Sequence, residues 1–258
     1  MLSLLKFEFR KLFRSKAFWV CLGLSLGFIL LSCIATKALE AAMGTITDES
    51  GNVLVETKIY GTTLLKGSFG SGSVSIIGGV MVAILVCEDY VGDTIKNVYS
   101  KGYSRDNVFF AKFISGLVAF MIMVLSGMIL SFLAGSFLFD GVGQVGENFV
   151  GSLFAIIFLA IAYYVIFFGV SILMKKLSSA IAINIVGPLG ITLVFTLVDS
   201  LLKIKDFKIS EVWIDTRLTQ MASVNVVTSD MIGAFVISLI VIAVMGGVSY
   251  LVNHKRDN

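Results

Sequence analysis

The sequence predicts an all-α membrane protein with six transmembrane helices, and two observations carry that prediction. Of the 258 residues, 57% are hydrophobic and only 14% are charged, whereas soluble domains carry about 25% charged residues. The apolar residues also stand in unbroken runs, instead of recurring with the period of a half-buried helix or strand. We therefore expect one transmembrane domain over residues 1–258, embedded in a lipid bilayer.

Six of these runs are long enough to cross about 30 Å of hydrocarbon as helices. None contains Asp, Glu, Lys or Arg, and they cover residues 17–35, 68–86, 113–137, 149–174, 179–198 and 231–252. Basic residues gather before the first run, between the second and third, after the fourth and at the C-terminus. The positive-inside rule therefore places these segments, and both termini, on the cytoplasmic side.

Residues 1–16 are expected to form an amphipathic helix in the membrane interface. Its basic side chains share one face and most of its apolar ones share the other, namely Leu2, Leu5, Phe9, Leu12 and Phe13. Such a helix binds lipid tails on one side and anionic headgroups on the other. Leu4 and Phe7 fall on the polar face. Two interpretations stay open: a topology anchor, or a helix whose Leu4 and Phe7 touch a cytoplasmic partner.

The loop over residues 88–107 reads EDYVGDTIKNVYSKGYSRDN. It is too polar to be buried in lipid and too long for a simple turn. Gly92 and Gly102 bracket a segment, 93–101, that predicts a short helix with Ile95, Val98 and Tyr99 on one side. The loop is either a solvated connector or a docking element for a soluble subunit.

Further features concern helix packing and the second long loop. Small residues recur four apart within two runs, which favours close helix contacts, either in one chain or between two copies; they are Gly23 and Gly27, then Gly127, Ser131 and Gly135. Pro188 is expected to kink the fifth helix, in a packing role or as a hinge or cavity-lining residue. Residues 199–230 mix charged and apolar side chains, which predicts an outer re-entrant segment of short amphipathic helices.

Several function classes are excluded on composition. A net charge of +3 is too small to indicate nucleic-acid binding. The six runs hold no ionisable residue that could bind a coupling ion, as self-powered transporters require. Residues 67–73 are rich in Gly and Ser but lack the Lys and Ser/Thr that end a phosphate-binding P-loop. Since the chain also shows no metal or catalytic cluster, we expect no cofactor and no enzymatic activity in it, and a partner that supplies energy.

One stretch resembles a known family. Thr94-Ile-Lys-Asn97, Lys101-Gly-Tyr-Ser-Arg105 and Phe110-Ala-Lys112 are similar to the coupling-loop pattern of type-2 (type V) ABC exporter permeases. Within that superfamily they look most like the bacitracin- and lantibiotic-immunity permeases and the phenol-soluble-modulin exporters. The similarity in layout extends over nearly the whole chain. Asp93 departs from the pattern, because it separates Gly92 from Thr94. The resemblance therefore defines the first residue of the coupling helix only to within about one helical turn.

The resemblance implies a permease in the bacterial cell membrane that exports an amphipathic peptide along a path lined by spans one, two and five. It implies a second permease copy, as a homodimer or pseudo-dimer, and two ABC ATPase subunits that bind ATP and Mg. The ATPase-coupling residues expected on this basis are Leu4, Phe7, Glu88, Asp89, Thr94, Ile95, Lys96, Tyr99, Lys101, Ser104 and Arg105. The alternatives are a polysaccharide or lipid-linked glycan exporter, and a non-transporting membrane scaffold or sensor subunit.

Overall fold

The computed structural model describes residues 1–43, 46–47, 53–55, 60–70, 73–92, 94–139, 141–143, 145–146, 148–202, 209–223 and 226–255. Nearly all of them are helical, as predicted. The elements are α1 (Leu2–Arg14), α2 (Lys16–Met43), β1 (Ile46–Thr47), β2 (Val53–Val55), α3 (Gly61–Gly70), α4 (Ser73–Val91), α5 (Thr94–Ser100), α6 (Arg105–Leu138), α7 (Phe149–Met174), α8 (Leu177–Leu202), the 3-10 helix η1 (Ile209–Val212), α9 (Ile214–Met221) and α10 (Thr228–Lys255). The antiparallel pair of β1 and β2 was not predicted.

Among the described residues, six helices are long and apolar enough to cross a membrane, so the chain is a multi-pass membrane protein. They are Lys16–Ala41, Val74–Val91, Arg105–Leu138, Phe149–Met174, Leu177–Leu201 and Thr228–Lys255. The fourth has the predicted limits. The prediction was wrong at the start of the second span, because residues 68–70 belong to the separate helix α3 and α4 begins at Ser73. Glycine and serine, which dominate residues 67–73, are poor helix formers and favour such a break.

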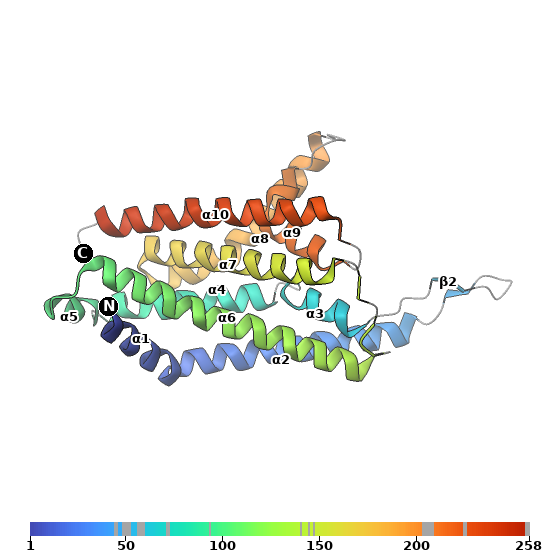
Figure 1. Cartoon of the computed structure of the whole chain (residues 1–258), viewed down its shortest axis with the longest axis horizontal. Helices are drawn as coiled ribbons and strands as arrows, with labels where there is room; N and C mark the ends of the chain where they lie inside the picture. The colour runs from blue at the N-terminus through green and yellow to red at the C-terminus, as the bar shows by residue number, and fades with distance from the viewer. Residues whose placement is uncertain are drawn as a thin grey trace.

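The helices form a bundle with α7 at its centre (Figure 1). The bulkiest fully buried side chains of the described residues include four aromatic ones from α7, each at most 1% exposed: Tyr163, Tyr164, Phe167 and Phe168. Helices α4, α6, α8 and α10 surround α7, and α2 packs on α4 and α6. Both termini and α5 lie at one end of the bundle, whereas α3 and the strands lie toward the other (Figure 1).

The stripe of small residues on α6 packs helices within the chain. A Cβ atom added to Gly127 would lie 2.8 Å from Ile29 Cδ1 of α2, and one added to Gly135 would lie 2.9 Å from Gly61 Cα of α3. The Ser131 hydroxyl between them donates a hydrogen bond of 2.8 Å to a backbone carbonyl of α3. Small side chains let α6 approach both neighbours closely, as the spacing predicts.

The small residues of α2 and the proline of α8 do not pack closely in the way that the α6 stripe does. Gly23 and Gly27 of α2 are exposed, and no described atom outside their own helix turns lies within 4 Å of a Cβ added to either. Their predicted contact therefore has no partner in the described part of this chain. Pro188 lies inside α8, which continues past it to Leu202, and it lines a groove that α8 shares with α7 and α10.

The segment after α8 folds back onto the bundle. Helix α9 buries Ile214, Leu218 and Met221 on one face. Its Asp215 carboxylate accepts hydrogen bonds from the hydroxyls of Tyr163 at 2.6 Å and Thr192 at 3.0 Å. Those two residues stand close to the midpoints of α7 and α8. The acidic side chain of Asp215, which belongs to α9, therefore contacts the middle of two spans. The apolar runs contain no acidic residue and give no sign of this contact.

Candidate functional site

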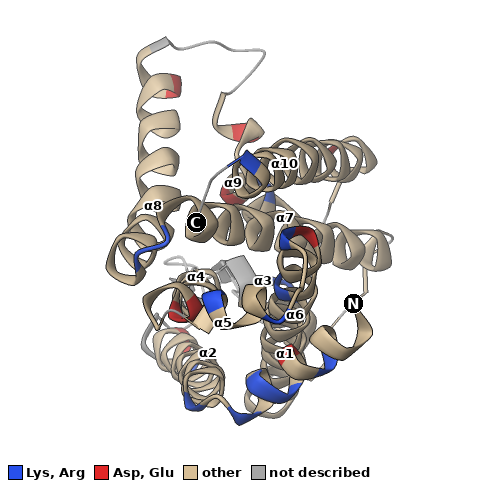
Figure 2. Cartoon of the chain, turned by 90° about the vertical axis from the view of Figure 1, so that its left-hand side faces the viewer, with Lys and Arg blue, Asp and Glu red and all other residues tan. Residues whose placement is uncertain are grey.

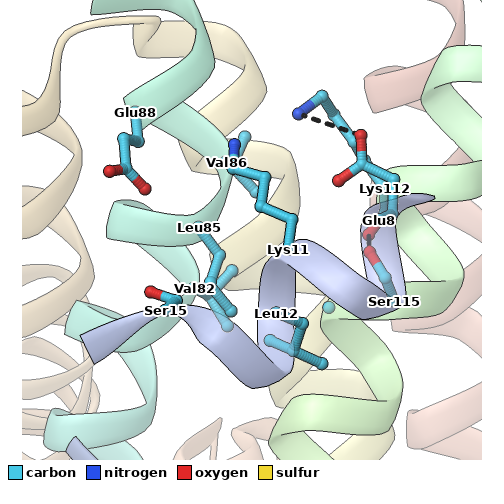
Figure 3. A pocket seen from close by; sticks show the side chains of 11 residues that line it. Glu8, Lys11, Leu12, Ser15, Val82, Leu85, Val86, Glu88, Lys112 and Ser115 are labelled. Carbon is cyan, nitrogen blue, oxygen red and sulfur yellow. Dashed lines mark hydrogen bonds and ion pairs between the residues drawn. The ribbon is translucent and has the colours of Figure 1, made fainter. Parts of the chain in front are cut away.

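Four charged side chains form a cluster where α1, α4 and α6 meet. Lys11 of α1 and Lys112 of α6 both pair with the carboxylate of Asp89, which lies near the end of α4. The ammonium of Lys112 also lies 3.8 Å from the Glu8 carboxylate of α1. Figure 3 shows Glu8 and Lys112 side by side, with Lys11 on the neighbouring turn of α1. We call these four residues the ion cluster.

Burial makes the pairing within the ion cluster obligatory. The side chains of Lys112, Glu8 and Asp89 are only 5%, 9% and 10% exposed, and that of Lys11 is 31% exposed. Removing a charge from water is costly unless an opposite charge and hydrogen bonds replace the solvent. The cluster holds two acids and two bases, so its charges balance. Three helices are thereby held in one fixed arrangement.

Helix α5 is attached to this cluster by its first residue. The hydroxyl of Thr94 donates a hydrogen bond of 2.9 Å to Asp89 Oδ1 and also lies 3.3 Å from the Asp89 backbone carbonyl. On the apolar side, Ile95 is 4% exposed and packs in a cluster with Leu4 of α1 and Val108 of α6. Val98 and Tyr99 pack against the same cluster, so the predicted short helix and its apolar side are confirmed.

The predicted faces of α1 need correction. Leu4, assigned to the polar face, is 3% exposed and packs inside the chain, whereas Leu2 and Phe13 of the predicted apolar face are 84% and 47% exposed. The buried face consists of Leu4, Glu8 and Leu12, one helical turn apart. Glu8 can lie on it because Lys112 compensates its charge, which a hydrophobicity pattern does not register. Phe7 is 55% exposed, as a contact with a partner requires.

The other predicted coupling residues surround a groove between α1 and α5. This groove holds about 230 Å³, and five members of the predicted set line it: Phe7, Asp89, Thr94, Ile95 and Lys101. Three more members, Glu88, Lys96 and Ser104, are exposed at the same end of the bundle, while Tyr99 and Arg105 are half-buried. Asp93, which departs from the family pattern, lies outside the described residues.

Ser104, one of the predicted coupling residues, has a structural role at the start of α6. It is the N-cap of α6, and its hydroxyl accepts a hydrogen bond of 3.3 Å from the Asn107 backbone N–H. Serine is a favoured N-cap because it satisfies one of the amides that the first helical turn leaves unpaired. The structure therefore explains Ser104 without a partner.

Of the four ion-cluster residues, only Asp89 was among the predicted coupling residues. Lys11 was assigned to the basic, headgroup-facing side of the first helix, Lys112 stood at the end of the family-like pattern, and Glu8 was not singled out. One signal was available: Lys112 stands alone between Phe109 and Phe113 in an otherwise apolar stretch. An ionisable residue in such surroundings indicates a specific partner.

The arrangement joins α5 at the surface to α1, α4 and α6 through one carboxylate. Among the described residues, no group of three His, Cys, Asp or Glu side chains could hold a metal ion. Figure 2 looks onto the end of the bundle that carries α5 and shows Lys and Arg segments on α1, α5, α6 and at the start of α8. The site is thus a basic, exposed surface whose base is an ion cluster joining three helices.

A known protein family matches most of this chain. The model of a family described as ABC-2 family transporter protein matches residues 4–199, which extend from Leu4 through most of α8 and include the ion cluster. No curated protein and no solved structure matches this chain.

Proposed function

Because the chain belongs to the ABC-2 family of transporter proteins, we propose that it is the permease subunit of an ATP-driven exporter, powered by a separate ABC ATPase. Membership of this family assigns the chain to the membrane component of an ABC transporter. The proposal adds the direction of transport, the coupling surface and the class of substrate. An amphipathic peptide, moved out of the cell, is the substrate that we propose.

The observation that carries the proposal is the attachment of α5 to the ion cluster. The side chains of Lys96 on α5 and of Lys101 directly after it are exposed, whereas the Thr94 hydroxyl donates a hydrogen bond to Asp89 on the buried side. Asp89 in turn holds Lys11 of α1 and Lys112 of α6. A subunit that displaces α5 therefore acts on α4 directly and on α1 and α6 through one carboxylate. This is the contact that an ATPase needs in order to drive a chain with no nucleotide-binding motif.

The same arrangement supports the proposed orientation and assembly. Both termini and α5 lie at one end of the bundle (Figure 1), and the positive-inside rule favours the cytoplasmic face of a bacterial cell membrane for it. Two ATPases and a second permease copy complete the proposed transporter. Exposed Gly23 and Gly27 support a close contact between α2 and a neighbouring helix of that second copy. The mid-span contacts of Asp215 support the predicted re-entrant segment.

The apolar surfaces of the spans support the amphipathic character proposed for the substrate. Large apolar side chains line the exposed surface of α8, including Val186, Leu193 and Val194, which are 64%, 60% and 54% exposed. We place the transport path along α2, α4 and α8. An uncharged apolar path suits one face of an amphipathic peptide helix better than it suits a sugar chain or an ion.

The coupling surface is tested by charge reversal on α5. The full chain is purified together with the ATPase that accompanies it from its native membrane and is reconstituted in liposomes. Lys96→Glu is expected to reduce peptide-stimulated ATP hydrolysis at least tenfold. The matched control is Lys176→Glu, which reverses an exposed lysine at the same end of the bundle but outside α5; it is expected to retain at least half of the activity.

Two results would contradict the proposal. Equal peptide-stimulated ATP hydrolysis in the Lys96→Glu and Lys176→Glu variants would show that α5 is not part of the coupling surface. An ATPase whose turnover is the same with and without the permease, whatever peptide is added, would show that the chain is not an exporter subunit.

A further inference from the structure

The junction of α1 and α2 carries exposed positive charge that the rest of the described chain does not neutralise. Helix α1 ends at Arg14, and Ser15 has an extended backbone (φ −68°, ψ 122°), so the chain turns there before α2 begins at Lys16 (Figure 1). Arg10, Arg14 and Lys16 are exposed at this turn. No acidic side chain of the described residues forms an ion pair with any of the three. Their charges are therefore available to an anion outside the chain.

Arg10 and Arg14 lie on a face of α1 that the ion cluster does not use. A spacing of four residues places them on adjacent turns of one side of the helix. The buried face of α1 consists of Leu4, Glu8 and Leu12, and Arg10 lies about 200° around the helix from Glu8. Guanidinium groups bind phosphate through two parallel hydrogen bonds. Two arginines one turn apart thus provide donors on both sides of one phosphate group.

Two exposed aromatic side chains accompany these arginines. Phe13 is 47% exposed and Trp19 is 55% exposed. The Trp19 indole Nε1 donates a hydrogen bond of 2.9 Å to the Phe13 carbonyl, which joins the start of α2 to the last turn of α1. Exposed tryptophan is typical of the boundary between lipid headgroups and hydrocarbon, because its ring is apolar and its N–H is polar. The indole therefore indicates the level of the bilayer surface.

The place of the junction in the chain decides what reaches it. Lys16 is the first residue of the first membrane-spanning helix, and Trp19 lies only about 5 Å farther along that helix. Headgroup phosphates are thus level with the arginines, and the upper parts of acyl chains are level with the aromatic rings. Unpaired positive charge favours anionic over zwitterionic lipid, by about fivefold for each Lys or Arg near the membrane surface.

We propose that the junction of α1 and α2 binds one anionic phospholipid. Its phosphate lies between Arg10 and Arg14, and its acyl chains begin against Phe13 and Trp19. The site is confined to the junction, whereas the sequence predicted only a general contact of the basic side of α1 with headgroups. It does not depend on the substrate or the ATPase proposed above.

Trp19 reports lipid contact directly, because bromine next to an indole quenches its fluorescence. The sequence has 2 tryptophans, so Trp213→Phe leaves only Trp19. The full chain with this substitution is reconstituted in two sets of vesicles that contain phosphatidylglycerol and phosphatidylcholine in the same proportions. Equal numbers of lipids are brominated in both sets, on phosphatidylglycerol in one and on phosphatidylcholine in the other. Only the lipid that contacts Trp19 then differs in its effect.

We expect the association constant at Trp19 to be at least about fivefold higher for phosphatidylglycerol than for phosphatidylcholine. This preference should fall toward equality at ~1 M salt, where the Debye length is ~3 Å. The complementary Trp19→Phe chain, whose single indole is Trp213, is expected to be quenched equally in the two sets.

A matched pair of double variants separates the junction from the charge of the whole surface. Arg10→Gln with Arg14→Gln is expected to lower the preference below about twofold. Lys176→Gln with Lys255→Gln also removes two exposed positive charges at the same end of the bundle, but outside the junction (Figure 1). This control is expected to retain the parental preference.

Three outcomes would overturn the proposal. Equal quenching of Trp19 in the two sets of vesicles would show that the junction does not select anionic lipid. A preference that survives the double arginine substitution, or that the double lysine control loses as well, would show that the lipid is attracted by the whole surface. An equal preference at Trp213 would lead to the same conclusion.

Discussion

Replacement of Lys112 by methionine tests the ion cluster. Methionine retains the length of the side chain but leaves Glu8 without its basic neighbour and Asp89 with Lys11 alone. Removing one partner from a buried ion pair costs about 3–5 kcal/mol. Since Lys11 still pairs with Asp89, we expect a loss near the lower limit, about 3 kcal/mol. Denaturant titration of the reconstituted chain measures this free energy of unfolding.

A double substitution distinguishes the lost pairing from lost packing. Asp89→Asn with Lys112→Met removes both charges, so it is expected to cost about 2 kcal/mol less than the sum of the single substitutions. Lys6→Met, on the exposed face of α1, is the control and is expected to stay within about 0.5 kcal/mol of the parent. If Lys112→Met costs no more than Lys6→Met, or if the two substitutions are additive, the cluster does not hold the three helices together.

Three further predictions concern the opposite half of the bundle. Gly135→Val should cost at least about 2 kcal/mol of unfolding free energy, because a side chain there clashes with the backbone at Gly61. Tyr163→Phe, which removes one hydrogen bond to Asp215, should cost about 1–3 kcal/mol and speed proteolysis within α9. Burial lowers the pKa of Lys66, so the folded chain binds this proton less tightly than the unfolded chain does; parental stability should rise with pH from that lowered pKa toward about 10.4 relative to Lys66→Met.

The sequence was sufficient to predict the helices that depend on local composition. The run at residues 149–174 has both predicted limits because it is apolar throughout and ends in Lys175 and Lys176. The start of α4 was predicted wrongly, since the run without charged residues begins at Ser68, whereas α4 begins at Ser73. Helix α6 begins eight residues before the predicted span, at its Ser104 N-cap, and Lys112 within that extension is paired with Asp89 and Glu8. Periodicity contains no information about such pairing.

The candidate site shows the same division. The position of α5 and its apolar side chains were predictable, because Gly92, Gly102 and the spacing of Ile95, Val98 and Tyr99 are local features. The burial of Glu8 was not predictable, since it depends on Lys112, more than 100 residues away. The Asp215 contact with two spans was missed for the same reason. The composition of one segment does not indicate which charged residue of another helix will pair with it.

The central claim is that a soluble ATPase contacts the chain at α5. A photoreactive amino acid in place of Lys96 tests it directly in the complex isolated from the native membrane. The control places the same group at Lys37, toward the far end of α2. We predict a crosslink to the ATPase from position 96 and none from position 37. No crosslink from position 96, or equal crosslinking from both, would contradict the claim.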